Sequence, residues 1–541
     1  MRASLPHHGS SSYAIPAVMT LVIAVAGCGG GDSDNNDNLE GPKTSEAPVV
    51  HQTGNATAGQ AVFRFETFGN ERFWTDAMRL QQGIVAAGVT PVDALRLGLS
   101  VDIDALPLAT QQAIAAELQN SGAAGPILND PATTIALINA NAVIGIAAKD
   151  SNGDGTIDVA NGDKTGATCA LCHTITDESV WALPGGGSIG KRLDGRAVHN
   201  LNFGALAAAA QNSRAFYPVL QLALDANGGA TLGRAPTGLT ENSTEAQVDA
   251  YLSNPSFYPI GMFDDTVDGN GDPMKNSPLL RTDLAAPWGT EGSIARLDNF
   301  SNLVYTALLD PTTLTTPGGR AFLMKLGGTA AGTEIADDYV KVLADTGVTS
   351  YPFVVAAAHT ATGTEDAPLG IRVDNQKLLD MNAYLNSLAA PAGASVDSSK
   401  ASRGRALFRI NCTNCHNVDQ SRPVPAFIID MKAIFPDDNP VVLLAQRDPP
   451  LNAILNTPNN IFDDKMAVVN ASIRGDKRGT ALPLLVDLAR KPNFLHDSSV
   501  ASLDALLDPS RGDSAPHPFY LNSSSLREDM VEFLRRLDTG G

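Results

Sequence analysis

The sequence predicts a mainly α-helical protein with little β-structure, built from two tandem domains of which the first is enlarged by insertions. Three observations carry this prediction. A Cys-x-x-Cys-His pentapeptide occurs twice, a Gly-x-Ala-aliphatic-Phe stretch occurs ahead of each copy, and apolar residues recur at three- and four-residue steps in several long segments. The apolar pattern is typical of amphipathic helices, and the paired motifs indicate a tandem duplication.

The two pentapeptides run from Cys169 to His173 and from Cys412 to His416. Their spacing is the attachment signal for c-type haem, in which both thiols bond to the porphyrin and the histidine coordinates the iron. Residues at i, i+3 and i+4 share one face of a helical turn, so both sulfurs and the imidazole meet one porphyrin. Structural zinc would need further ligands at finger spacing, and a disulfide would use the same pairs differently. We expect two covalent haems held by Cys169, Cys172, Cys412 and Cys415, with His173 and His416 as iron ligands.

The fifth cysteine, Cys28, ends the first segment of the chain. An apolar run from Ala14 to Ala26 follows Arg2 and leads into Gly27 and Cys28, which resembles a bacterial lipoprotein signal with Cys28 as the acylated residue. The run is too short to span a bilayer, in keeping with a cleaved signal. Residues 1–28 are therefore expected to be a lipoprotein signal peptide, and the mature protein to be lipid-anchored in the periplasm or at the cell surface. Gly29, in place of Asp, favours the outer membrane.

Length and charge narrow the classes of partner. The chain has 541 residues, more than one core usually spans, and its 43% hydrophobic and 18% charged residues are ordinary for globular protein. A formal charge of -20 argues against nucleic acid and against direct adhesion to anionic lipid. It suits a basic redox partner, although solubility alone would explain it equally well.

Residues 29–55 are rich in Gly, Asp, Asn and Ser and have no apolar period, so they are expected to form a flexible tether. Order is expected from Gly59, in the stretch Gly59-Gln60-Ala61-Val62-Phe63. Several helices then separate this stretch from Cys169 and enlarge the first half. They are predicted at Phe73–Ala87, Thr110–Leu118 and Ala132–Ile146.

A loop with alternating oxygen ligands precedes the first pentapeptide. Asp150, Asn152, Asp154 and Asp158, with a glycine at the sixth position, resemble the start of an EF-hand calcium loop. The twelfth position holds Asn161, so the bidentate glutamate of that loop is missing. Calcium binding and an Asp/Asn/Gly turn that binds nothing both stay open.

A second repeat follows each pentapeptide. The runs Leu279–Ala285 and Glu291–Asp298 recur as Leu484–Ala489 and Asp497–Asp504. Each half then closes with an apolar helix, and an Ala, Pro, Gly and Ser-rich linker separates the halves. The closing helices are predicted at Gln376–Leu388 and Leu526–Leu537, and the domains at residues 56–390 and 400–541.

These motifs, together with the run from Pro492 to Leu503, resemble the bacterial dihaem cytochrome c peroxidase superfamily. That superfamily includes the methylamine-dehydrogenase maturation enzyme and the rubber oxygenase branch, to which the stretch Phe63–Trp74 and the enlarged first half are more similar. The resemblance implies two cytochrome c-like domains, in each of which the first helix packs against the last. It also implies that one haem carries electrons with both axial positions filled, while the other keeps or frees a position for an oxidant.

The resemblance guides the choice of a sixth ligand for the second haem. His517 is preferred because it falls beyond Asp497-Ser498-Ser499, where family members supply Met, Tyr or His to the electron-transfer haem. His496 and Met466 are the alternatives. A bis-His site would have a lower potential than a His/Met site.

The first haem has two candidate distal histidines. His199 follows His173 at a short distance, and His359 precedes the last helix of its half as His517 does. A loop role for His199, bonded to a haem propionate or to backbone, is equally open.

Several further side chains are candidates around a distal pocket. Glu291 joins His199 there, with Glu66, Glu71 and Asp497 as further acid/base groups, although a structural role is open for each. The three tryptophans are expected to pack in cores rather than to relay electrons. They are Trp74, Trp181 and Trp288.

The sequence thus predicts an exported dihaem c-type cytochrome oxidoreductase of the haem peroxidase type. Electrons would pass from the C-terminal haem to hydrogen peroxide or dioxygen at the N-terminal haem, supplied by a small cytochrome or cupredoxin. We expect the protein to bind no nucleic acid and to be attached to the membrane only through its lipid anchor. Three alternatives remain: a non-catalytic periplasmic electron-transfer cytochrome with both irons six-coordinate, a rubber oxygenase-like dioxygenase acting on an apolar substrate, and a lipoprotein whose first haem is only structural.

Overall fold

A computed structural model describes most of the chain after residue 53, and helices dominate it, so the prediction of a mainly α protein is confirmed. The chain divides into two compact units, residues 1–48 and 49–541, and the described residues all lie in the second. None of their helices is both long enough and apolar enough to span a bilayer. The described residues are 54–222, 238–263, 274–282, 288, 294, 296–412, 416, 429–430, 441–446, 465–469, 480–481, 485–495, 498–512, 515, 517 and 519–537.

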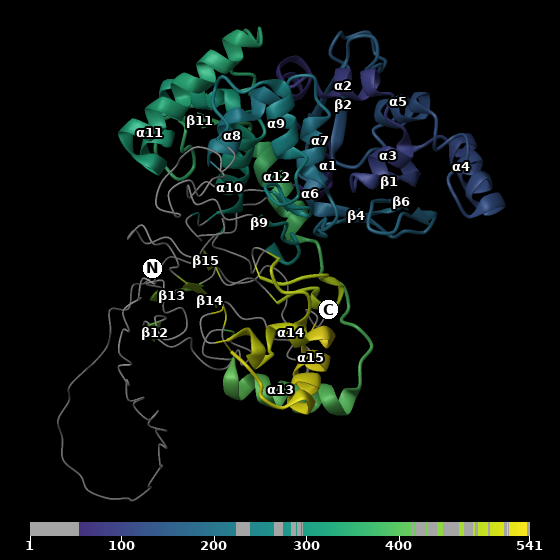
Figure 1. Cartoon of the computed structure of the whole chain (residues 1–541), viewed down its shortest axis with the longest axis vertical. Helices are drawn as coiled ribbons and strands as arrows, with labels where there is room; N and C mark the ends of the chain where they lie inside the picture. The colour runs from purple at the N-terminus through teal and green to yellow at the C-terminus, as the bar shows by residue number, and fades with distance from the viewer. Residues whose placement is uncertain are drawn as a thin grey trace, which may run out of the picture. The chain divides into compact units, whose positions relative to one another are not determined.

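Helical elements follow one another through both halves (Figure 1). The α-helices are α1 (Ala56–Phe65), α2 (Leu80–Ala87), α3 (Pro91–Arg96), α4 (Leu108–Ser121), α5 (Pro131–Asn139), α6 (Ala170–His173), α7 (Phe203–Ala208), α8 (Tyr217–Leu222), α9 (Glu245–Leu252), α10 (Leu297–Leu303), α11 (Pro317–Asp345), α12 (Asn375–Asn386), α13 (Ser398–Asn411), α14 (Leu503–Leu506) and α15 (Ser524–Arg536). The π-helical turns are η1 (Phe73–Ala77) and η5 (Val304–Leu308), and the 3-10 turns are η2 (Ile103–Ala105), η3 (Ser213–Phe216), η6 (Pro311–Thr315), η8 (Leu488–Arg490) and η9 (Pro509–Arg511).

The strands are short and form small separate sheets. Parallel pairing joins β1 to β6, and the other named pairs are antiparallel. The sheets are β1 (Val101–Asp102), β6 (Ser188–Gly190) and β5 (Trp181–Ala182); β2 (Ile146–Lys149) and β3 (Lys164–Ala167); β4 (Thr174–Thr176) and β7 (Arg192–Asp194); β8 (Met262–Phe263) and β9 (Met274–Lys275); β10 (Ala358–His359) and β11 (Ile371–Arg372); and β12 (Ile429–Asp430), β13 (Val441–Gln446), β14 (Lys465–Val469) and β15 (Thr480–Ala481).

Helices α1 and α12 cross in close contact, although they come from opposite ends of the first half. The Asn55 side chain caps α1 by accepting hydrogen bonds from two of its first N–H groups. At the crossing a Cβ on Gly59 would lie 1.8 Å from the carbonyl oxygen of Asp380, so only glycine fits. One turn later Phe63, fully buried, meets Tyr384 with ring centroids 5.9 Å apart.

Helices α13 and α15 repeat this crossing in the second half. A Cβ on Gly404 would lie 1.9 Å from the carbonyl oxygen of Asp529, and Phe408 meets Phe533 at 5.5 Å between centroids. In both halves the glycine and the aromatic residue are one turn apart, as are their partners. The repeated Gly-x-Ala-aliphatic-Phe stretch therefore specifies one helix crossing twice.

The second sequence repeat also has matching structure in both halves. Trp288 and Ile294 form an isolated antiparallel bridge, and Phe494 and Val500 form another at the corresponding positions. In both copies the bridged residues are six positions apart in the sequence.

Two predicted helices are shorter in the structure than in the sequence analysis. The segment Phe73–Ala87 is interrupted at Arg79, which has φ +60° and donates to the Thr346 carbonyl oxygen at 2.6 Å. The predicted helix Ala132–Ile146 ends at Asn139, because Asn141 has φ +54° and Ile146 begins β2. In both cases tertiary hydrogen bonds or a left-handed residue override the apolar period.

Candidate haem sites

The first pentapeptide forms the short helix α6, directly after the β2–β3 pair. Gly145, with φ +83°, lets the backbone of α6 approach closely, since a Cβ there would lie 2.2 Å from Leu171 Cα. The Thr168 N–H also donates to the Gly145 carbonyl oxygen at 3.0 Å. This packing fixes the helical turn on which Cys169, Cys172 and His173 are placed.

The imidazole of His173 is held by a backbone carbonyl from a distant segment. Its Nδ1 lies 2.8 Å from the Ser277 carbonyl oxygen, so Nδ1 carries the proton and Nε2 is left as an acceptor. Burial lowers the pKa of His173 to about 4, so the ring is neutral near pH 7. A neutral histidine whose other nitrogen donates to a carbonyl is the usual arrangement of an iron or zinc ligand.

The thiols of the first site lie in an apolar environment. Cys169 Sγ is 3.3 Å from the Tyr305 hydroxyl oxygen and 3.9 Å from Met381 Sδ. Burial raises the pKa of Cys169 to about 11 and that of Cys172 to about 12. The thiols are thus neutral near pH 7, and their setting fits the thioether bonds of a covalent haem.

His199 lies among cations close to this site. Its neighbour Val198 donates its N–H to the Cys172 carbonyl oxygen at 3.0 Å. The Nδ1 of His199 is buried and makes no hydrogen bond. Burial first, and then the charges of Lys275 and Lys491, lower the pKa of His199 to about 3.

Two lysines lie beside His199, and the Asp487 carboxylate offsets part of the charge of Lys491. Lys275 contacts the Asn493 carbonyl and side-chain oxygens, and its ammonium lies 5.9 Å from the Phe494 ring centroid. Burial lowers the pKa of Lys275 to about 7 and also lowers that of Lys491. Such a group of buried donors fits an anionic partner, and the propionates of a haem are anionic.

No histidine among the described residues makes a ring contact with His173. His359, the other candidate distal ligand, is exposed on β10. Glu291 lies outside the described residues. Among the described residues, neither candidate histidine therefore makes a ring contact with His173.

The second pentapeptide begins at the end of α13. Cys412 caps that helix, and the His416 N–H donates to the Cys412 carbonyl oxygen at 2.7 Å. Cys415, like Cys28, lies outside the described residues.

His416 and His517 face each other, although about a hundred residues separate them in sequence. Their ring centroids are 6.4 Å apart with planes at 56°. Two iron–nitrogen bonds of about 2 Å and two nitrogen-to-centroid distances of about 1 Å together span about 6 Å, so this spacing fits two axial ligands of one iron. Burial lowers the pKa of each to about 4, and the Nδ1 of His517 is buried without a partner. His496 and Met466 are the alternative sixth ligands for the second haem. His496 lies outside the described residues, and Met466 lies in β14.

The candidate calcium loop is folded by its own hydrogen bonds. The Asp150 carboxylate accepts from the N–H groups of Gly153 and Gly155, and the Asp163 carboxylate accepts from three further N–H groups. Within the described part of the chain, no three His, Cys, Asp or Glu side chains converge as they would around a metal ion. Calcium at Asp150, Asn152, Asp154 and Asp158 stays a prediction.

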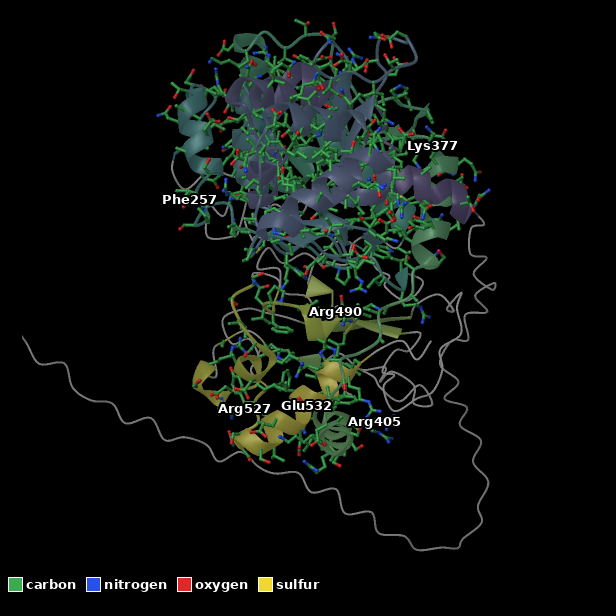
Figure 2. The ribbon with its side chains drawn as sticks, turned by 90° about the vertical axis from the view of Figure 1, so that its right-hand side faces the viewer. Phe257, Lys377, Arg405, Arg490, Arg527 and Glu532 are labelled. Carbon is green, nitrogen blue, oxygen red and sulfur yellow. The ribbon has the colours of Figure 1, made fainter. Side chains whose placement is uncertain are left out.

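The other candidate acid/base and tryptophan side chains that the structure describes make contacts within the fold. Glu66 accepts from the N–H groups of Thr67 and Phe68 and pairs with Lys377, which is labelled in Figure 2. Glu71 accepts from the Thr67 hydroxyl at 2.6 Å. Trp74 is 2% exposed and packs among phenylalanines, as expected for core tryptophan. Asp497 lies outside the described residues.

Three residues at the first site were not predicted from sequence. Ser277 acts through its backbone carbonyl, which has no sequence signature. Tyr305 and Met381 could have been suspected, because both are large residues in apolar helical segments of the first half, but nothing in the pattern assigns them to Cys169.

No family model and no curated protein matches this sequence. Among solved structures, a chain of the hydrazine synthase of Kuenenia stuttgartiensis, studied under 20 bar xenon, aligns with 51% of this chain and 75% of its own length. The identity is 17% and the TM-score 0.23. Likeness at this level carries no argument about fold or function.

Proposed function

We propose that the protein is an exported, lipid-anchored dihaem c-type cytochrome oxidoreductase with two cytochrome c-like domains. Electrons from a small cytochrome or cupredoxin would enter at the second site, and hydrogen peroxide or dioxygen would be reduced at the first. The observation that carries the proposal is the difference between the two sites. His416 faces His517 at 6.4 Å, whereas among the described residues no histidine ring contacts His173.

The residues that would hold the cofactors are those of the two pentapeptides, together with His517. Cys169, Cys172, Cys412 and Cys415 would form the thioether bonds, with His173, His416 and His517 as axial ligands. Haem, when bound, would supply one-electron redox chemistry at both sites, and an open axial position at the first would admit the oxidant.

Groups of the chain itself orient His173 and surround His199 at the first site. The Ser277 carbonyl oxygen fixes the ring of His173 and makes Nε2 the more basic nitrogen. His199 is flanked by two lysines, and its unpaired Nδ1 is buried. These surroundings favour a bond from His199 to a carboxylate of the cofactor over a role as iron ligand. Glu291 remains the candidate for a distal proton-transfer group.

Low-temperature EPR of the purified oxidised protein, with and without hydrogen peroxide, tests this function. We expect one low-spin signal from the second site and one high-spin signal that peroxide alters. A pyridine haemochrome assay should give two haems per chain. Two low-spin signals indifferent to peroxide would instead identify an electron-transfer cytochrome, and the proposed oxidant reduction would be wrong.

A further inference from the structure

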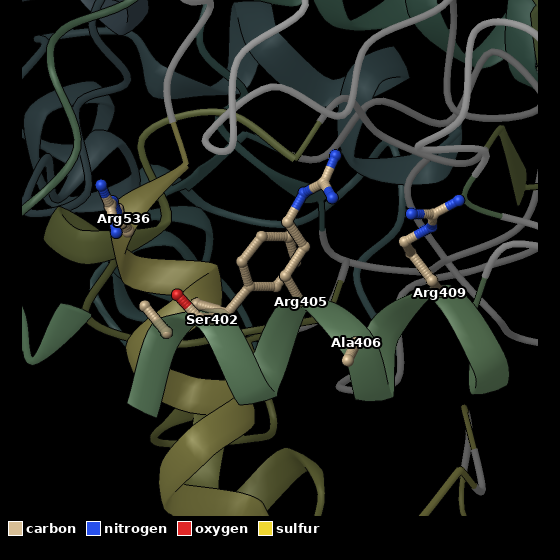
Figure 3. Close-up of a pocket in the computed structure, with 7 residues that line it drawn as sticks. Ser402, Arg405, Ala406, Arg409 and Arg536 are labelled. Atoms are coloured by element: carbon tan, nitrogen blue, oxygen red, sulfur yellow. The ribbon is translucent and has the colours of Figure 1, made fainter. Parts of the chain in front are cut away.

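A pocket of about 260 Å³ on the second helix pair is lined by arginines. Figure 3 shows Arg405 and Arg409 projecting from the same side of α13, with Arg536, the last residue of α15, beside the same pocket. Ala406 and Phe533 contribute apolar lining. The neighbouring Ile410 is 78% exposed, so an apolar side chain adjoins the cations.

Two of the three arginines that line this pocket, Arg405 and Arg536, have no carboxylate partner on the described helices. The carboxylates of α15 already pair with other cations, and in the described part of the chain Arg405 and Arg536 form no ion pair. The Nε of Arg405 is buried without a hydrogen-bond partner. An unpaired guanidinium N–H favours an incoming carboxylate, which would satisfy it. The existing pairs are Lys400–Glu528, Arg403–Asp529 and Arg535–Glu532.

The pocket is close to the attachment point of the second haem. Helix α13 ends at Asn411, and Cys412 follows it directly. Arg405 is two helical turns before Cys412, or about 10 Å along the axis. A protein bound on this surface would therefore lie beside the site at which electrons are proposed to enter.

Local charge, rather than net charge, decides which partner this surface favours. The chain carries -20 overall, which alone would repel an acidic protein. However, exposed charges separated by more than a Debye length of about 8 Å are largely screened at physiological ionic strength. For a partner in contact with this surface, the charge of the nearby arginines therefore matters more than the net charge of the chain.

We propose that the surface formed by Arg405, Arg409, Ile410 and Arg536 docks a small acidic redox protein, which we call the acidic donor. This inference rests on the proposed function and assigns the sign of the donor's charge, opposite to the basic partner that the net charge suggests. The reduced donor loses one electron, which is taken up at the second haem. Arg405 and Arg536 pair with donor carboxylates, and Ile410 and Ala406 supply apolar contact.

The test is stopped-flow reduction of the full-length, haem-loaded protein by an acidic small cytochrome or cupredoxin and by a basic one of similar potential. The Arg405→Glu/Arg536→Glu variant should react with the acidic donor at least ten-fold more slowly at low ionic strength, with a weaker salt dependence. The control, Lys191→Glu/Lys325→Glu, changes the net charge equally at lysines in the first half. It should change the rate less than two-fold.

The outcomes separate this inference from the proposed function. Equal rate losses in both variants, or none in either, would overturn the docking surface while the spectra of both haems remain as proposed. If no low-spin haem is found in the parent protein, the proposed function itself fails. Binding to vesicles of phosphatidylglycerol, compared with phosphatidylcholine, adds a third readout. If the Arg405→Glu/Arg536→Glu variant lost vesicle binding but was still reduced by the acidic donor at the parent rate, the surface would be a lipid contact. That result would contradict docking of the acidic donor.

Discussion

At the scale of single residues, the Nδ1 atoms of the histidines differ in ways that bear on function. In His173 this nitrogen is engaged by the Ser277 carbonyl, whereas in His199 and His517 it is buried and unpaired. A buried ring nitrogen without a partner costs stability unless something binds the ring. The two unpaired histidines are therefore the positions at which a bound cofactor would have most to contribute.

Replacement of His517 tests its assignment as sixth ligand. His517→Ala should convert the second haem from low-spin to high-spin, because no other described histidine faces His416. His517→Met should restore a low-spin haem with a higher potential. His359→Ala is the matched control, since His359 is exposed on β10. EPR and redox titration measure these changes, and a low-spin second haem in His517→Ala would contradict the assignment.

The lysine beside His199 gives a pH-dependent prediction. Burial lowers the pKa of Lys275 from 10.5 to about 7, so between these values the unfolded chain holds a proton that the folded chain lacks. Stability should therefore rise with pH across this window, and Lys275→Met should abolish the contribution.

A carboxylate of bound haem next to Lys275 would stabilise its charged form and remove this slope. We expect the slope in Cys169→Ser/Cys172→Ser, which would lack the first haem, and its absence in the fully loaded protein, measured by denaturant unfolding at several pH values. The same slope in both proteins would argue against an anion at Lys275.

Residue-scale prediction from the sequence was most specific where chemistry fixes residue type and spacing. The four cysteines and two histidines of the pentapeptides were proposed from the motif, and His517 was preferred from the family resemblance. Ser277 could not be found, because any residue supplies a carbonyl. The charges around His199 come from Lys275 and Lys491, which are distant in sequence, so only the fold reveals them.

At the scale of elements, a glycine and an aromatic residue one turn apart define each helix crossing. The aromatic residue fills the space beside the contact, and the glycine permits the contact itself. The sequence predicted both N-terminal helices and both closing helices, with ends within two residues of those observed for α12 and α15. It missed α11, although Thr316 caps it and Pro317 begins it, since its apolar pattern is interrupted by glycines.

Adding a methyl group to the glycine at the α13–α15 crossing tests whether the close helix contact requires glycine. Gly404→Ala gains about 1 kcal/mol of helix propensity, but its Cβ would lie 1.9 Å from the Asp529 carbonyl oxygen. Overpacking of this kind costs about 3 kcal/mol, so we expect a net loss of about 2 kcal/mol in unfolding free energy. Ser402→Ala, at an exposed position of α13, serves as control. Denaturant titration that found the two variants equally stable would refute the crossing.

At the scale of the whole molecule, two repeats in sequence correspond to two crossings and two bridges in structure, while the described surroundings of the two pentapeptides differ. The predicted boundaries at residues 28, 55, 390 and 400 stay predictions. Duplication was visible in the sequence because the crossing tolerates few residue types. A difference between the two sites was also expected from the sequence, but its details were not, because they depend on which distant segments pack beside each pentapeptide.

Removal of one pair of thiols should leave the other haem in place. Cys169→Ser/Cys172→Ser and Cys412→Ser/Cys415→Ser should each contain one haem per chain by the pyridine haemochrome assay, because each pentapeptide has its own helix pair. The EPR signal that remains should be low-spin in the first variant and high-spin in the second. Loss of both haems in either variant would show that the two sites do not form independently.

The crossings have a further consequence for how the first half could grow. Asn55 and Asp380, hydrogen-bonded beside the first crossing, are 325 residues apart in sequence, whereas Arg403 and Asp529 at the second are 126 apart. Loop-closure entropy grows only with the logarithm of length, so closing the longer loop costs only about 1 kcal/mol more. Chain length between the two helices is thus weakly constrained by thermodynamics. Insertions could accumulate inside the first half while the same pair of helices continued to close it.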